Sequence, residues 1–289
     1  MALLALIAVT AVWGVTFVQV KDAVEIYPLY AFLALRFAIA SVALGPFALG
    51  RLRGLRASGA GISAVLGLLL AAGYALQTEG LARTTVSSTG FITGLYVIFT
   101  PLLALVFFRQ RIGAAGWLGV AISLAGLAML SGIHAGSITG DALVLAASGV
   151  YSAQIVLLER VAPRLDPVVL TFVEMLAACA GFAAIAAARS EFETPHGWTV
   201  WGALLVTGLF ASALGFFVQS WAQRRTSATR TALAFAMEPV WTALFGFTLA
   251  GDRLGVLGWG GCAAILAGIV LAEPSAATTM RRLNLLLSD

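Results

Sequence analysis

Two polar stripes run along apolar stretches of the sequence, and they contain the residues best suited to chemistry. In each stripe polar or aromatic side chains recur every three or four residues, which places them on one face of a helix. The stripes are Thr85, Thr89, Thr93, Tyr96 and Thr100, and Ser227, Thr231, Phe235, Glu238 and Thr242. Hydroxyls in such a stripe can also bond back to carbonyls of their own helix. Because the stripes match and include Tyr96 and Glu238, we favour a polar cavity shared by the two helices.

Four other apolar segments carry matched aromatic, amide and hydroxyl groups. These are Thr10, Trp13 and Thr16; Ser148, Tyr151 and Gln154; Tyr74, Gln77 and Thr78; and Phe216, Gln219 and Ser220. Such groups suit a small amphipathic solute, whose apolar part stacks on the rings while its polar end is hydrogen-bonded. Taken singly, Trp13 could fill a core and the glutamines could join neighbouring helices. As a matched set they predict a solute-binding site.

Three ionisable residues, Arg36, Glu174 and Glu238, lie deep within apolar segments. A charge at that depth is costly, so each needs a partner or a function. Arg36 and Glu174 could form a salt bridge; alternatively, Arg36 extends to the outer headgroups and Glu174 is protonated and hydrogen-bonded locally. Glu238 is the acid on a stripe, and it could bind a solute ammonium or carry a proton.

Two prolines interrupt the striped segments. Pro239 follows Glu238 directly, and Pro101 is expected to kink its helix one turn later than the equivalent position. The kinks could act as hinges, or packing alone could tolerate them. We therefore treat Pro101, Pro239, Arg36 and Glu174 as gating or structural residues. The residues assigned to substrate binding are Trp13, Thr16, Tyr74, Gln77, Tyr96, Thr100, Tyr151, Gln154, Gln219 and Glu238.

An internal repeat explains why the stripes match. Displacing the sequence by 142 residues overlays Gly73–Gly126 on Gly215–Gly268, with identical pairs such as Gln77/Gln219 and Trp117/Trp259, and the earlier part repeats at 138 residues. Each copy holds five apolar spans, an odd number, so the second copy must enter the membrane from the opposite side. Inverted repeats of this kind build the alternating gates of many transporters. We expect residues 1–136 and 137–273 to be the two halves, with 274–289 as a cytoplasmic tail.

The composition is that of a membrane protein. Charged residues make up 10% of the chain and hydrophobic residues 61%, far from the balance of a soluble domain. The charges are confined to short breaks between apolar runs of about 20 residues, the length that spans a bilayer as a helix. We expect an all-α fold with ten transmembrane helices, at residues 2–20, 28–50, 58–82, 85–108, 112–132, 140–159, 167–188, 198–223, 227–250 and 255–273.

The basic residues predict the orientation. With the N-terminus inside, twelve Lys and Arg residues fall in cytoplasmic breaks and four in outer breaks, as the positive-inside rule requires. We therefore expect a multi-pass protein of the inner (plasma) membrane with both termini cytoplasmic. The positive charge is explained by orientation and by contact with the lipid bilayer, so we expect no nucleic-acid partner.

Other chemistry finds little support in the sequence. Cys179 and Cys262 lie inside apolar spans and the chain has two His, so we expect no disulfide, metal or cofactor. An intramembrane enzyme would need a nucleophile–base pair at depth, and none is evident. Glycines in the fifth and tenth spans, such as Gly119 and Gly261, predict close helix packing or a dimer contact, which leaves a monomer and a homodimer open.

These features resemble the drug/metabolite transporter superfamily, and within it the ten-helix EamA-type exporters, similar to the YddG-type amino-acid exporters. Residues Gln77–Leu81 followed by Thr84–Tyr96 resemble the signature of the family's first half. Residues Thr226–Ala228, Met237–Val240 and Gly251–Leu254 resemble the signature of its second half. The resemblance covers residues 5–273 and implies two inverted five-helix bundles around a central cavity. The first, third, fourth, sixth, eighth and ninth spans would line that cavity. The family's Gly-Glu-Arg turn is replaced by Arg109–Gln110–Arg111, so nothing acidic is expected there.

The sequence therefore predicts an exporter of small metabolites, with amino acids, including aromatic ones, as the favoured solutes and alternating access as the mechanism. A multidrug or organic-cation efflux pump is the main alternative, because an aromatic cage with one deep acid would also hold a cation. A metabolite uptake carrier is the other.

Overall fold

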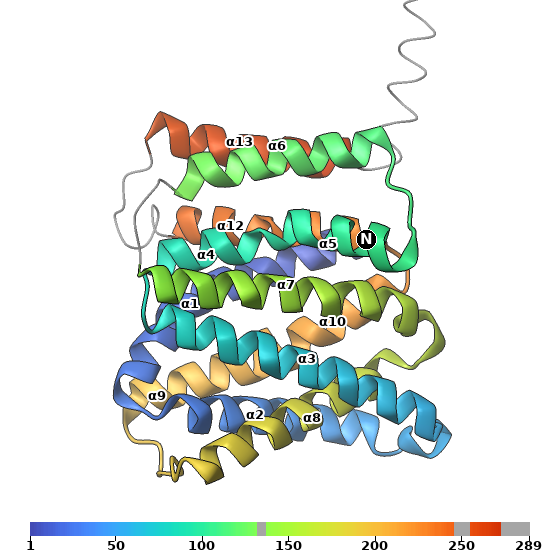
Figure 1. Cartoon of the computed structure of the whole chain (residues 1–289). Coiled ribbons are helices and arrows are strands. Elements are labelled where there is room, and N and C mark those ends of the chain that lie inside the picture. Colours follow the sequence, from blue (N-terminus) through green and yellow to red (C-terminus); the bar gives the residue numbers. More distant parts are fainter. Residues whose placement is uncertain (132–136, 246–254, 273–289) are drawn as a thin grey trace, which may run out of the picture.

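The computed structural model of the chain describes residues 1–131, 137–245 and 255–272, and within these ranges the chain forms ten helical rods (Figure 1). The rods are α1 (Ala2–Ile26), α2 (Leu29–Ala48), α3 (Ala57–Leu81), α4 (Val86–Gly94) with α5 (Tyr96–Phe108), α6 (Ala114–Ser131), α7 (Ile138–Val161), α8 (Pro167–Ala188), α9 (Gly197–Leu205) with the π-helix η3 (Val206–Leu214) and α10 (Gly215–Gln223), α11 (Ala228–Phe235) with α12 (Met237–Phe245), and α13 (Val256–Leu271). Two short 3-10 turns, η1 (Leu52–Gly54) and η2 (Ala162–Arg164), lie in the loops. The expected tail at 274–289, the expected division at 136 and the expected ends of the spans at 132, 250 and 273 lie outside the described residues.

The rods have the length and composition of membrane spans. Seven are at least 18 residues long and apolar enough to cross a bilayer, and the segments Ala114–Met129 of α6 and Val256–Leu271 of α13 are shorter apolar helices. The chain is therefore an all-α membrane protein, as its composition predicts. The expected end of the first span at residue 20 differs from the helix, because α1 continues through the charged residues Lys21, Asp22 and Glu25 to Ile26.

Polar contacts between loops gather at the two ends of the bundle. At one end the Lys21 ammonium donates to the Thr84 carbonyl (2.9 Å) and the Thr84 hydroxyl donates to Asp141 (2.7 Å). At the other end Arg51 pairs with Asp166 at 3.2 Å. The break between α3 and α4 thus lies beside the start of α7, and the break between α2 and α3 lies beside the start of α8.

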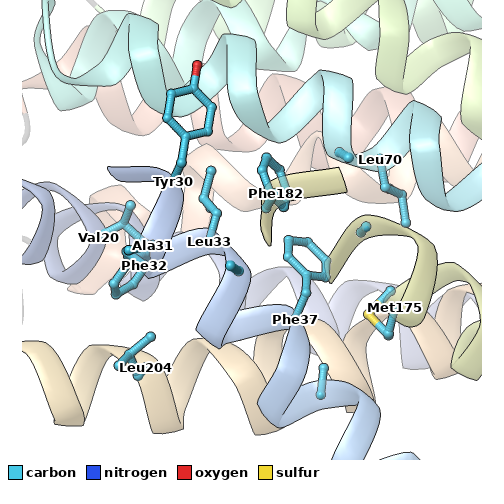
Figure 2. Packing of buried hydrophobic residues seen from close by; sticks show 14 of the residues in the cluster. Val20, Tyr30, Ala31, Phe32, Leu33, Phe37, Leu70, Met175, Phe182 and Leu204 are labelled. Atoms are coloured by element: carbon cyan, nitrogen blue, oxygen red, sulfur yellow. The ribbon is translucent and has the colours of Figure 1, made fainter. Parts of the chain in front are cut away.

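The largest apolar core lies among α1, α2, α3, α8 and α9. Phe37 of α2 stacks on Phe182 of α8 with ring centroids 5.5 Å apart, and it meets the Tyr74 ring edge-on at 5.3 Å. Figure 2 shows Phe37, Phe182, Met175 and Leu70 packed between these helices. The packing of this core positions α2 and α3, the helices that carry Arg36, Tyr74 and Gln77.

At the opposite edge α6 and α13 pack along each other (Figure 1). A Cβ on Gly119 would lie 2.6 Å from the Gly268 carbonyl oxygen, and one on Gly126 would lie 2.7 Å from that of Gly261. The expected glycine packing of the fifth and tenth spans is therefore a contact between these two helices.

Replacing Gly119 with Ala should lower the stability of the protein by about 1–3 kcal/mol, because the methyl group meets backbone that cannot move aside. Thermal unfolding in detergent, followed by tryptophan fluorescence, measures the change. Gly113→Ala is the matched control, since a Cβ there has nothing within 4 Å. Equal midpoints for the two variants would contradict the close contact.

Candidate functional site

A cavity lies among the helices of the bundle, and the empty space within it and at its opening to solvent amounts to about 680 Å³. It is lined by Trp13, Thr16, Phe17, Val20, Arg36, Leu70, Tyr74, Gln77, Thr78, Leu81, Thr93, Tyr96, Tyr151, Gln154, Ile155, Phe216, Gln219, Phe235 and Glu238. The six spans expected to contribute all do so. The second span, α2, also contributes through Arg36.

Six aromatic rings from six helices form a continuous wall of this cavity. In order, each ring touching the next, they are Tyr151, Tyr74, Phe216, Trp13, Phe235 and Tyr96, with centroid separations between 4.8 and 6.1 Å. Most of these contacts are edge-to-face, the arrangement that aromatic quadrupoles prefer. Aromatic side chains from six helices thus line the cavity, which suits an apolar or aromatic group on a solute.

Trp13 is fixed in this wall by the π-helix η3. Its indole N–H donates to the Ala211 carbonyl at 2.8 Å. A π-helix is a rare and costly conformation that often occurs at functional sites. Because the N–H is already bonded, Trp13 offers a solute its ring rather than a hydrogen bond.

Tyr96 and Glu238 meet at the centre of the bundle. The repeat equates these two residues, and the Tyr96 hydroxyl donates to the Glu238 carboxylate at 3.4 Å. Glu238 is 7% exposed and has no ion-pair partner in the described part of the chain. A solute ammonium is the kind of group that would complete this site.

Both striped helices are interrupted beside this pair. The fourth rod breaks at Leu95 and the ninth at Ala236, within one residue of each other in the repeat. Pro239 suits its break, since it cannot donate to the carbonyl of Phe235, the last residue of α11. Pro101 lies inside α5, six residues after the break at Leu95, and the carbonyl that it leaves without a donor belongs to Val97. A kink at Pro101 therefore stays a prediction.

Arg36 also faces the cavity, which corrects both expectations for this residue. It is 3% exposed and does not extend to a headgroup, and it forms no ion pair with Glu174. Its Nε donates to the Ser212 hydroxyl (2.8 Å), its Nη2 donates to the Tyr74 hydroxyl (3.1 Å), and its guanidinium lies 4.5 Å from the Tyr74 ring centroid. Within the described residues this buried cation therefore has neutral partners alone.

The deep glutamines belong to two hydrogen-bonded groups. Gln77 accepts from the Tyr151 hydroxyl (3.0 Å) and donates to the Thr93 hydroxyl (2.9 Å). Gln219 donates to the Gln154 side-chain oxygen at 3.1 Å. All of these side chains except that of Tyr151 are fully or almost fully buried. The glutamines both join neighbouring helices and line the cavity. The two interpretations of the sequence, helix contact and solute binding, are therefore compatible.

Several candidate residues lie outside the cavity, or their hydroxyls already donate to carbonyls of their own helix. Thr100 is buried in packing away from the cavity, and Glu174 lies behind the cavity wall. Thr16 lines the cavity but donates to the carbonyl of Trp13 at 2.8 Å. Thr89 and Thr231 bond back to Thr85 and Ser227, as the local interpretation of the stripes allows.

Other lining residues were not identified from the sequence. Phe17, Val20, Leu70, Leu81 and Ile155 are apolar residues in apolar helices, so nothing in their type distinguishes them from packing residues. Ser212, which holds Arg36, sits in the π-helix, for which the sequence carries no signal. Within the described residues no group of three or more His, Cys, Asp or Glu is arranged to hold a metal.

Comparison with known proteins gives consistent results. The sequence model of the EamA-like transporter family matches residues 1–132 and again residues 138–272. A protein of Archaeoglobus fulgidus described as an uncharacterized transporter is 28% identical over 93% of this chain and 85% of its own length. The uncharacterized inner membrane transporter YedA of Escherichia coli K12 is 29% identical over 92% of this chain and 89% of its own.

One solved crystal structure has the same fold. It superposes with a TM-score of 0.78 and covers 96% of this chain and 98% of its own, at 20% sequence identity. At that identity the likeness concerns the fold alone.

Proposed function

Because the chain belongs to the EamA-like transporter family, we propose that it carries small amphoteric metabolites, amino acids among them, across the inner membrane. Export is the favoured direction. The relative YedA is described as an inner membrane transporter, and the apolar rods of this chain suit the same setting.

The observation that carries this proposal is the presence of a buried base, Arg36, and a buried acid, Glu238, in one aromatic-walled cavity. Arg36 supplies a cation without an acidic partner among the described residues, and Glu238 supplies an acid without a basic one. Arg36 and Glu238 both line this cavity, so a solute bound there can reach both groups. A solute with a carboxylate, an ammonium and an apolar body would satisfy each of these groups.

Alternating access through two inverted halves, residues 1–136 and 137–273, is the mechanism that we propose. The matched breaks at Leu95 and Ala236 support it, since discontinuous helices at a repeat interface are typical of transporter binding sites. The cavity extends along α1 and α3 toward Val20 and Leu81. Apolar residues such as Leu6 pack toward the opposite end of α1 and do not line the cavity.

An organic-cation pump is the second candidate, favoured by the position of Glu238 beside Tyr96 and the aromatic wall. The buried charge of Arg36 opposes it, because a solute with no negative group would meet an uncompensated cation in the same cavity.

Flux measurements in proteoliposomes test the proposal. The panel contains phenylalanine and leucine, the amine and the carboxylic acid that correspond to each, and cationic dyes, with and without a pH gradient. We expect the amino acids to be transported faster than either single-charge analogue. Transport of dyes and amines without amino acids would favour the cation pump instead.

A further inference from the structure

Glu174 is a buried acid that the proposed transport site does not use. It lies in the middle of α8, its side chain is 0% exposed, and it does not line the cavity. Its Oε1 accepts a hydrogen bond from Gln154 Nε2 at 3.2 Å, and its Oε2 is buried without a partner in the described residues. An ionised carboxylate enclosed in this way is held by one amide, whereas buried charges ordinarily have several partners.

No charged group of the helices packed around α8 compensates Glu174. Arg36 of α2 is bound to Ser212 and Tyr74, and η3 and α10 contain no ionisable residue. The remaining titratable or charged groups on α2, α3, α7 and α8 are Tyr30, Tyr74, Glu79, Asp141, Tyr151, Glu159, Arg160 and Cys179, and none of them bonds to Glu174 in the described part of the chain. Glu174 Oε2 is therefore a buried oxygen at which a proton would be stabilising.

Two glutamines connect this acid to the cavity. Gln154 and Gln219 both line the cavity, Gln219 donates to Gln154, and Gln154 donates to Glu174. The side-chain oxygen of Gln219 is, like Glu174 Oε2, buried without a partner. Gln223 extends the group by accepting from Gln219 at 3.0 Å and donating to the carbonyl of Ile155 at 2.8 Å.

We propose that Glu174 is a proton-binding site behind the cavity wall, and that Gln154 couples its proton to the occupancy of the cavity. The coupling rests on the proposed transport function; the proton site does not. A solute group that accepts the Gln154 N–H withdraws the one donor that supports the ionised carboxylate, so Glu174 takes up a proton. By reciprocity a protonated Glu174 frees Gln154 for the solute, so proton and solute bind together.

The proton site is tested by infrared difference spectroscopy on the purified full chain without solute. Glu174 and Glu238 are both buried acids that can give a pH-dependent carboxylic-acid C=O band, so the measurement is made on Glu238→Gln. The band that this variant shows should be absent once Glu174→Gln is added to it. Gln154→Met is a second variant in case Glu174→Gln does not fold. It keeps the Glu174 carboxyl but removes its hydrogen-bond donor, so a shift in the frequency of the band assigns the band to Glu174. A band that the double variant retains unchanged, or the absence of any such band in Glu238→Gln, would overturn the proposal.

The coupling is tested with phenylalanine in weakly buffered detergent solution containing a pH indicator. Wild type should take up protons on binding, and its affinity should rise about tenfold from mildly alkaline to mildly acidic buffer. Glu174→Gln should bind without proton uptake and without this pH dependence. Proton release on binding, or uptake that persists in Glu174→Gln, would contradict the coupling. Failure of phenylalanine to bind would count against the proposed solute and leave the infrared result to decide on Glu174.

Discussion

Replacing Arg36 with Gln should weaken the binding of carboxylate-bearing solutes by about 10- to 100-fold. A hydrogen bond to a charged group contributes about 1.5–3 kcal/mol, and each tenfold change in affinity corresponds to about 1.4 kcal/mol. The guanidinium is enclosed and held by Ser212 and Tyr74, so water cannot take its place at little cost. Competition by unlabelled solutes against transported phenylalanine, in proteoliposomes, measures the change.

Two controls separate carboxylate binding from general damage at Arg36. An amine without a carboxylate should bind to Arg36→Gln at least as well as to the wild type, since it no longer meets a cation. Ser212→Ala removes one partner of the guanidinium but keeps its charge, so it should cause a smaller loss than Arg36→Gln. A loss of the same size for the carboxylate-free amine would show that Arg36 only supports the packing of α2.

The fold could be predicted from the sequence because its main constraints are local and repeated. Apolar runs long enough to cross a bilayer set the rods, and the overlay of Gly73–Gly126 on Gly215–Gly268 indicated which rods correspond. The end of α1 could not be placed, since Lys21, Asp22 and Glu25 continue as helix past the apolar run. Hydropathy marks where a chain leaves lipid, while a helix ends where its backbone hydrogen bonds end.

The candidate site could be predicted where the repeat doubled a signal. Gln77 and Gln219, and Tyr96 and Glu238, are equated by the repeat, and all four lie around one cavity. Thr100 continues its stripe by one turn and lies outside the cavity. A stripe shows which face of a helix is polar. How far the cavity extends along that face depends on the packing of the neighbouring helices, which the stripe does not show.

Arg36 shows what a single sequence leaves open. A lone arginine in an apolar span can pair with an acid, reach a headgroup or face a cavity, and its residue type is the same in each case. The outcome depends on Ser212, which the π-helix turns toward it, and on Tyr74. Such a contact between distant spans follows from the folded arrangement and has no sequence periodicity of its own.

Replacing Glu238 with Gln should weaken the binding of ammonium-bearing solutes by about 10- to 100-fold, for the same energetic reason as at Arg36. The substitution keeps the size of the side chain and leaves an oxygen to accept from Tyr96, so α12 should keep its position. The same competition assay, with amines as the unlabelled solutes, measures the loss.

The matched control is Tyr96→Phe, which removes the hydroxyl that donates to Glu238 but keeps the charge and the ring in contact with Phe235. Its loss of amine affinity should be well below that of Glu238→Gln. The binding of a carboxylic acid without an amine should be preserved in Glu238→Gln and lost in Arg36→Gln. Because the two variants would then fail on opposite halves of the same solute, the crossed pattern cannot come from a general loss of folding. If both variants lose acids and amines alike, the cavity does not bind amphoteric solutes through these two charges.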